Sequence, residues 1–305
     1  MRVSPWLGLV LVAGACSFDA PGVAIDGGGS DARDAGPDAA SVDDDNDGVL
    51  NPVDNCRAVA NLNQHDEDGD GDGDVCDNCP TVGNADQANL GETNVGQAID
   101  EAGDACDPFP AIAGNDLVFF DGFDTDDPLW RSTGGVWVVA GDAVTQTDPL
   151  SRSHYYYAGD PHGDVVVDVT ARVTAVPANG FGIGSLAQWD IGPNDGVGYM
   201  CQLADFPSAP IEVAEFALIG AAAWDQLERT QHSALTPAVT PASAWTLRHA
   251  AIGAARSCAA TDSSGFTIDT PPHLHVDVPS GRFGFRSGYA SMQFENIVVY
   301  SVAGS

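Results

Sequence analysis

One spacing of acidic residues occurs twice in this chain and limits what the surrounding segment can fold into. Each copy has an aspartate at every second position, then a glycine, and a closing aspartate eleven positions after the first. The first copy runs from Asp43 to Asp54 and the second from Asp66 to Asp77. Alternating carboxylates before a glycine allow a short loop to wrap its oxygens around one hard cation. The spacing therefore predicts two calcium sites.

Acidic residues are concentrated in the same segment. The chain has a formal charge of −33, and residues 43–107 hold eighteen acids against one arginine, Arg57. Such a run is usually solvated and disordered, but a disordered run would not repeat glycines and cysteines in register. The chain has no lysine and no basic patch that could hold a nucleic acid backbone. We expect calcium as a cofactor and no nucleic acid partner.

The start of the chain, from Met1 to Cys16, has the pattern of an export signal. The apolar stretch Trp6–Ala15 follows Arg2 and is too short to span a bilayer. Residues 11–16 resemble a bacterial lipobox, which implies that Cys16 is lipidated after cleavage. The alternative is an ordinary secretory signal with an incidental cysteine.

Residues 17–42 are rich in Gly, Ala, Asp, Pro and Ser, so they bury too little surface to fold. We expect a flexible linker there. The protein would then be exported, either as an outer-membrane or cell-surface lipoprotein or in secreted form, with a lipid anchor as its only membrane contact.

Six of the seven cysteines remain after the leader, an even number that suits an oxidising compartment. The pair Cys76 and Cys79 has the spacing of a zinc or redox motif. Its neighbours are aspartates, which raise the pKa of a thiol rather than lower it, so structural disulfides are the better interpretation.

The acidic segment contains an internal repeat. Asp54–Cys56 recurs as Asp77–Cys79, at the same offset that separates the two aspartate loops. Gly73–Asp77 recurs as Gly103–Asp107 at a longer offset, because seven residues are inserted within 91–99.

The aspartate loops and the motifs DNCP and GDxCD together resemble thrombospondin type 3 repeats over residues 43–110. The resemblance implies a stalk of calcium loops with little regular secondary structure and with the disulfides Cys56–Cys76 and Cys79–Cys106. The ligands that it implies are Asp43, Asp45, Asp47, Asn51 and Asp54 in the first loop and Asp66, Asp68, Asp70, Asp74 and Asp77 in the second.

A third loop is degraded. At the longer offset, glycine and alanine replace its first two acids, which leaves Asp100, Asp104 and Asp107. We expect this site to be weak or absent. The alternative for these loops is an EF-hand, which we exclude because aspartate closes each loop and nearby prolines and glycines prevent the flanking helices.

Period-two patterns appear from about residue 115 onward. In the stretch 165–173, valine or alanine at every odd position alternates with Asp168, Thr170 and Arg172, which predicts a strand with one buried face and one wet face. Phe283 and Phe285 alternate with polar or small residues. A change of phase in the last strand predicts a bulge near Asn296. About a dozen short strands without long amphipathic helices predict a mainly β fold, an antiparallel sandwich over residues 115–305.

Four landmarks in this region resemble the concanavalin A-like lectin/glucanase sandwich: Phe119–Phe123, Gly135–Val139, Gly281–Phe285 and Phe294–Val299. The resemblance implies a jelly-roll fold more than an activity. Cys201 and Cys258 lie in predicted strands, and we expect them to pair across the sandwich or between neighbouring strands.

Glucanases of this fold carry paired carboxylates, but no local pair here has the right geometry. Glu212 and Glu215 are three positions apart, so on a strand they point to opposite faces. Asp164 and Asp168 would be roughly 13 Å apart at the rise of a strand. We assign no catalytic residue and expect a sandwich that binds an extracellular glycan or surface protein. A glycoside-active enzyme and an envelope spacer are the alternatives.

Overall fold

The computed structural model describes residues 42–149, 152–175, 180–190, 197–206, 211–218, 224–232, 243–276 and 278–302. The predicted leader, and with it the lipidation of Cys16, lies outside these residues. In the part of the chain that is described, no helix has the length and hydropathy needed to cross a bilayer.

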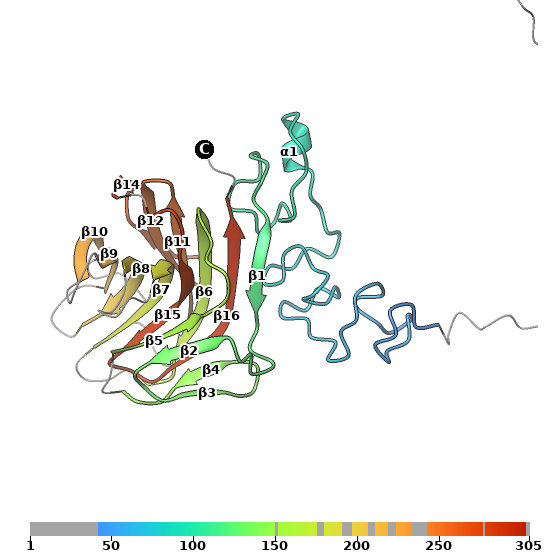
Figure 1. Ribbon diagram of the computed structural model, residues 1–305, viewed down its shortest axis with the longest axis horizontal. Coiled ribbons are helices and arrows are strands. Elements are labelled where there is room, and N and C mark those ends of the chain that lie inside the picture. The colour runs from blue at the N-terminus through green and yellow to red at the C-terminus, as the bar shows by residue number, and fades with distance from the viewer. Residues whose placement is uncertain are drawn as a thin grey trace, which may run out of the picture.

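Two antiparallel sheets pack face to face (Figure 1). Among the described residues, sheet A has nine strands and sheet B has seven. In sheet A the order is β13 (Thr267–Asp269), β12 (Ala255–Asp262), β11 (Ala244–Ile252), β6 (Val165–Val173), β16 (Met292–Ser301), β4 (Val144–Gln146) and β3 (Trp137–Val139), with β1 (Leu117–Asp121) on β16 and β14 (His273–Leu274) on β12. In sheet B it is β10 (Trp224–His232), β9 (Ile211–Leu218), β8 (Val197–Asp205), β7 (Phe181–Asp190), β15 (Arg282–Gly288), β5 (Arg152–Tyr157) and β2 (Trp130–Thr133). The prediction of a mainly β antiparallel sandwich is confirmed.

The period-two residues fill the space between the sheets. Val167 and Val169 of β6 are fully buried there, as are Phe283 and Phe285 of β15. The ring of Phe285 stacks on that of Phe294 of β16, with 4.0 Å between the centroids. The register between β16 and β6 shifts just after Phe294, which confirms the predicted bulge near Asn296.

A disulfide between Cys201 and Cys258 joins the two sheets. Cys201 lies on β8 of sheet B and Cys258 on β12 of sheet A, with 5.2 Å between their Cα atoms. Of the two pairings that the sequence left open, the structure has the one across the sandwich.

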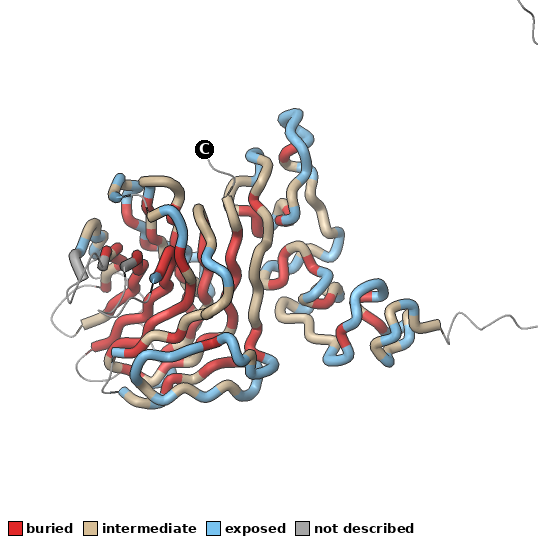
Figure 2. The backbone as a smooth tube through the Cα atoms, in the orientation of Figure 1, coloured by how far each residue is buried: buried red, intermediate tan, exposed pale blue. Residues whose placement is uncertain are grey.

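The repeat segment consists of loops and one short helix, α1 (Gly91–Asn94), and it packs against the outer face of sheet A (Figures 1 and 2). Its first loop lies farthest from the sandwich. Its second half forms an apolar cluster with residues of β6 and β16, namely Cys79, Ala102, Cys106, Val166, Val298 and Tyr300. The expected stalk is therefore docked along the sandwich over its second half.

Candidate functional site

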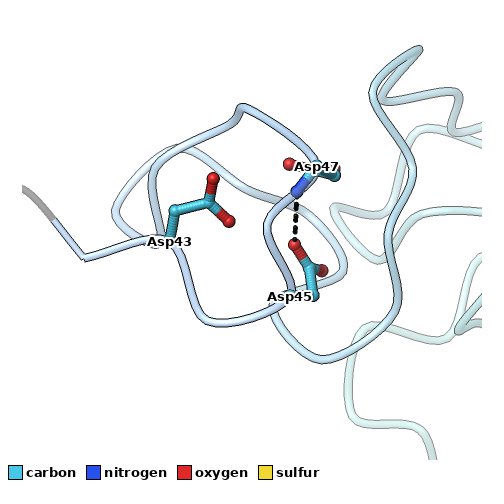
Figure 3. Close-up of side chains that lie close together, drawn as sticks. All are labelled: Asp43, Asp45 and Asp47. Carbon is cyan, nitrogen blue, oxygen red and sulfur yellow. Dashed lines mark hydrogen bonds between the residues drawn. The ribbon is translucent and has the colours of Figure 1, made fainter.

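The first acidic loop gathers three carboxylates at one point (Figure 3). One oxygen from each of Asp43, Asp45 and Asp47 lies within 4.8 Å of the others. The backbone N–H groups of Asn46 and Gly48 donate to the two oxygens of Asp43, at 2.7 and 3.1 Å. Gly48 has a φ of +100°, which a residue with a Cβ rarely adopts, so the sharp turn requires the glycine of the motif.

The second acidic loop repeats this geometry. One oxygen from each of Asp66, Asp68 and Asp70 lies within 4.8 Å of the others. The N–H groups of Gly69 and Gly71 donate to Asp66 at 2.8 and 3.1 Å, as the matching residues do in the first loop. Two copies of one sequence motif therefore form two copies of one carboxylate cluster.

The closing acid of each loop is nearly buried and is held by the residues of the repeated motif. Asp54 Oδ1 accepts hydrogen bonds from the N–H of Cys56 and from the side chain of Gln64, both at 2.9 Å. Asp77 Oδ1 accepts the equivalent bonds from Cys79 and from the side chain of Gln87. These bonds fix the closing carboxylates in place while leaving their second oxygens for another partner.

Three carboxylate oxygens in these loops are buried and have no hydrogen-bond donor among the residues that the structure describes: Asp45 Oδ2, Asp54 Oδ2 and Asp68 Oδ2. Burial and the charges of Asp70 and Asp77 raise the pKa of Asp68 to about 6. Buried carboxylates without donors cost free energy unless a cation pairs with them. An all-oxygen donor set on a tight loop suits calcium, so the residues present fit the predicted ion.

The remaining implied ligands, Asn51 and Asp74, make other contacts. The side chain of Asn51 accepts the N–H of Asp44 at 3.0 Å and donates to its carboxylate at 2.7 Å. Asp74 accepts the N–H of Glu67, and its Oδ2 lies 2.7 Å from Nδ1 of His65. Asp74 lies outside the two carboxylate clusters, and the role of both residues as ligands stays a prediction.

The third loop brings together a set of residues that differs from the expected one. Asp100 and Asp107 meet, but their third partner is Glu92. Asp104 instead accepts the N–H groups of Leu90 and Gly91 on its Oδ1, at 2.9 and 2.8 Å. Sequence reasoning missed Glu92, although it is the only acid among the residues inserted between the second and third repeats.

Two disulfides pair as the thrombospondin resemblance implies, Cys56 with Cys76 and Cys79 with Cys106. The glycine of each GDxCD motif packs against one of them. A Cβ added at Gly73 would lie 2.7 Å from Cys56 Sγ, and one at Gly103 would lie 2.8 Å from Cys79 Sγ. These glycines are required because the chain passes too close to the sulfurs for any side chain.

A pocket of about 450 Å³ lies on the outer face of sheet B. It is lined by side chains from β5, β8, β9 and β15 and from the turn after β15, among them Arg152, Met200, Gln202, Glu212, Arg286 and Tyr289. The sequence did not predict this pocket, because its residues come from strands far apart in the chain.

Arg286 is the most unusual residue of this pocket. Its side chain donates to Oε1 of Gln202, yet only 6% of the residue is exposed, and its Nε has no hydrogen-bond partner in the described part of the chain. Burial, and then the charge of Arg152, lower its pKa to about 10. The guanidinium of Arg152 lies over the ring of Tyr289, 5.0 Å from the centroid.

Within the described residues, no carboxylate lies within ion-pair distance of either arginine. Glu212 lines the same pocket, but it is 3.6 Å from Arg229 and accepts a hydrogen bond from Gln231. In a chain with a charge of −33, two arginines without an acidic partner form a local positive site.

The two glutamates weighed for catalysis lie on opposite faces of β9. Glu212 points to the outer face of sheet B, whereas Glu215 lies inside the sandwich, fully buried, 3.2 Å from Nε2 of His249. Their placement on opposite faces confirms the prediction from strand phase.

A family model described as thrombospondin type 3 repeat matches residues 31–64 and 64–87. No curated protein sequence matches the chain.

Among solved structures, the chain is similar to carbohydrate binding module CBM66 from Bacillus subtilis, with 13% identity, a TM-score of 0.44 and coverage of 57% of this chain and 96% of that one. It is similar to a seed lectin from Lotus tetragonolobus, with 14% identity, a TM-score of 0.44 and coverage of 61% and 99%. The GH43 protein BlXynB from Bacillus licheniformis has 11% identity, a TM-score of 0.43 and coverage of 60% and 39%. At these identities and scores, the assignment of the fold rests on the two sheets themselves.

Proposed function

We propose that this chain is an exported calcium-binding protein whose sandwich binds a saccharide that carries an anionic group. The calcium part is supported by the two aspartate clusters and by the match of residues 31–87 to thrombospondin type 3 repeats. The saccharide part is carried by one observation: Arg286 is buried within a pocket and has no acidic partner among the described residues.

Calcium would fold the repeat segment by neutralising its carboxylates. Each cluster holds three aspartates within 4.8 Å, and the surrounding acids repel one another when no cation is bound. Because metal binding of this kind is coupled to folding, the ion would stabilise the segment together with its two disulfides. The repeats would then hold a fixed position on the sandwich.

Among the described residues, Arg286 and Arg152 have no acidic partner, and a carboxylate or sulfate on a sugar would provide one. Arginine binds such groups through paired, charge-assisted hydrogen bonds. Phe216 and Tyr289 line the same pocket and offer apolar ring surface of the kind that packs against sugars. The acidic remainder of the protein would repel anions elsewhere, so binding would be confined to this pocket.

We infer binding without turnover. A retaining glycosidase needs two carboxyl groups about 5 Å apart at one bond. In the pocket described here, Glu212 is the acid that lines the wall, and it is engaged by Arg229. A glycoside-active enzyme remains the alternative function, and it is tested together with binding below.

Export is supported by the three disulfides, which persist in oxidising compartments. Lipidation of Cys16 would then attach the protein to a membrane surface, with residues 17–42 as a tether. Mass spectrometry of the mature protein tests this part, because an acylated Cys16 at the new N-terminus has a defined added mass.

The saccharide proposal is tested with the full chain in calcium and with dextran sulfate, polygalacturonate and neutral dextran as probes. We expect the two anionic polymers to bind and neutral dextran not to bind. Arg286→Gln should weaken binding at least about tenfold, since a hydrogen bond to a charged group contributes about 1.5–3 kcal/mol. Arg172→Gln is the matched control, because Arg172 pairs with Glu295 on the other sheet.

Equal binding of neutral dextran would reject the anionic group, and binding of none of the three polymers would reject the saccharide pocket. Release of reducing sugar from polygalacturonate would favour the enzyme. Binding without release is the result that we expect.

A further inference from the structure

The third repeat keeps the framework of a calcium loop although it has lost two acids. Asp100 Oδ2 accepts the N–H of Gly114, fourteen positions later, at 3.0 Å. Asp47 and Asp70 accept the N–H of the residue fourteen positions later in the first and second loops. Asp107 Oδ1 accepts the N–H of the residue two positions later, as the closing acids Asp54 and Asp77 do. The loop is therefore folded like the others.

Glu92 stands where the missing acids would be. It lies on α1 in the insertion that separates the second and third repeats, and its carboxylate lies within 4.8 Å of those of Asp100 and Asp107. The insertion is held closely, because a Cβ on Gly91 would lie 1.8 Å from the carbonyl oxygen of Pro110. The insertion thus places the Glu92 carboxylate beside the two remaining acids of the third loop, Asp100 and Asp107.

The Glu92 carboxylate is buried without a donor outside the cluster. The residue is 0% exposed, and apart from the neighbouring Asp107 carboxyl, neither Oε1 nor Oε2 has a hydrogen-bond partner among the described residues. Asp107 is 7% exposed, and its Oδ2 also has no other partner there. Two buried carboxylates facing a third acid are strongly unfavourable when ionised, unless a cation lies between them.

We infer that Glu92, Asp100 and Asp107 form a third calcium site, in which a glutamate from the insertion replaces the two acids that the motif has lost. The ligands are carboxylate oxygens, which suit a hard divalent cation. This inference extends the calcium binding proposed above, and its ligand set has Glu92 in place of Asp104.

The location gives this ion a distinct effect. Asp100 Oδ2 also accepts the N–H of Asn115, two positions before β1 begins, at 2.8 Å. Ala102 and Cys106 lie between Asp100 and Asp107 in the chain. Both pack against Val298 and Tyr300 of β16. An ion at this point would therefore fix the end of the repeat segment to sheet A, whereas ions in the first two loops would stiffen the segment itself.

The test is the number of calcium ions bound per chain, measured on the full disulfide-bonded protein by native mass spectrometry and equilibrium dialysis. We expect three ions for the unchanged protein and two for Glu92→Gln, which keeps the size of the side chain. Glu101→Gln removes an exposed acid of the same repeat and should keep all three. Asp43→Asn should lose one ion from the first loop while the third site stays filled.

A second readout separates the site from a general loss of structure. In hydrogen exchange, calcium should slow the amides of Gly114 and Asn115, which donate to Asp100, in the unchanged protein but not in Glu92→Gln. Two ions in the unchanged protein would reject the third site and leave the proposed function intact, and no ions would reject both. Three ions in Glu92→Gln would show that Glu92 is not a ligand.

Discussion

Glu215 and His249 face each other inside the sandwich, beside the disulfide that joins the two sheets. Glu215 on β9 is in register with Cys201, and His249 on β11 is in register with Cys258. The side-chain contact of 3.2 Å and the disulfide therefore cross the same part of the core from sheet B to sheet A. One covalent and one polar link hold this end of the sandwich together.

Removing the covalent link should destabilise the sandwich. The cysteines are 57 residues apart, and the loss of loop entropy for such a closure predicts about 4 kcal/mol. We expect Cys201→Ala with Cys258→Ala to lower the free energy of unfolding by about that amount, as measured by urea denaturation in calcium. A loss below about 1 kcal/mol would mean that the bridge contributes little.

Removing the polar link should also be costly, because it leaves His249 buried without its partner. We expect Glu215→Ala to destabilise the protein by about 2–4 kcal/mol. Glu212→Ala, three positions earlier on the outer face, should cost less than about 1 kcal/mol. Equal effects in the two variants would contradict the placement of these acids on opposite faces.

Acidity should stabilise the calcium-free protein and weaken calcium binding. Burial and neighbouring acids raise the pKa of Asp68 and of Asp107 from 3.8 to about 6. Groups whose pKa is higher in the folded state contribute stability below the unfolded pKa, and that stability is lost as the pH rises through the folded pKa. In the chelated protein, Asp68 and Asp107 should therefore contribute more to the free energy of unfolding at pH 4 than at pH 7.

Calcium should reverse that order, because its ligands must be deprotonated. Urea unfolding at both pH values, with and without calcium, measures the effect. Stabilisation by calcium that is equal at pH 4 and pH 7 would contradict the assignment of these carboxylates as ligands.

The glycines beside the disulfides should not tolerate a side chain. A Cβ at Gly73 would lie 2.5 Å from Asn55 Oδ1 and 2.7 Å from Cys56 Sγ. We expect Gly73→Ala to destabilise the repeat segment by about 1–3 kcal/mol and to lower the yield of correctly paired disulfides. At Gly83 the nearest atom would be 3.5 Å away, so Gly83→Ala is the control. The same yield for both variants, by mapping of disulfide-linked peptides, would contradict this packing.

Local patterns in the sequence predicted much of this structure. The two aspartate loops form from residues close in the chain, so their spacing alone indicates the clusters at Asp43–Asp47 and Asp66–Asp70. The alternation in Val165–Val173 likewise predicted a strand, and β6 has those bounds. Such features are encoded within a few residues, where backbone periodicity decides which side chains meet. The second face of β6 was expected to be wet, but Val166 and Asp168 on that face are buried, and Val166 packs against the repeat segment.

Features that depend on distant segments were not predicted. Glu92 lies close to Asp107 because the insertion folds back on the third repeat, and no sequence motif predicts that fold. Arg286 occupies an outward position in the alternation of β15, which favours an exposed side chain, yet neighbouring strands and turns bury it.

Calcium binding is the central claim, and calorimetric titration of the chelated full chain tests it directly. Aspartate clusters with unpaired buried oxygens predict saturable heat on adding calcium, with at least two ions bound per chain, and a radius of gyration that decreases in small-angle scattering as the carboxylates are neutralised. A chain that gives no calcium-dependent heat and keeps the same radius of gyration would contradict the account.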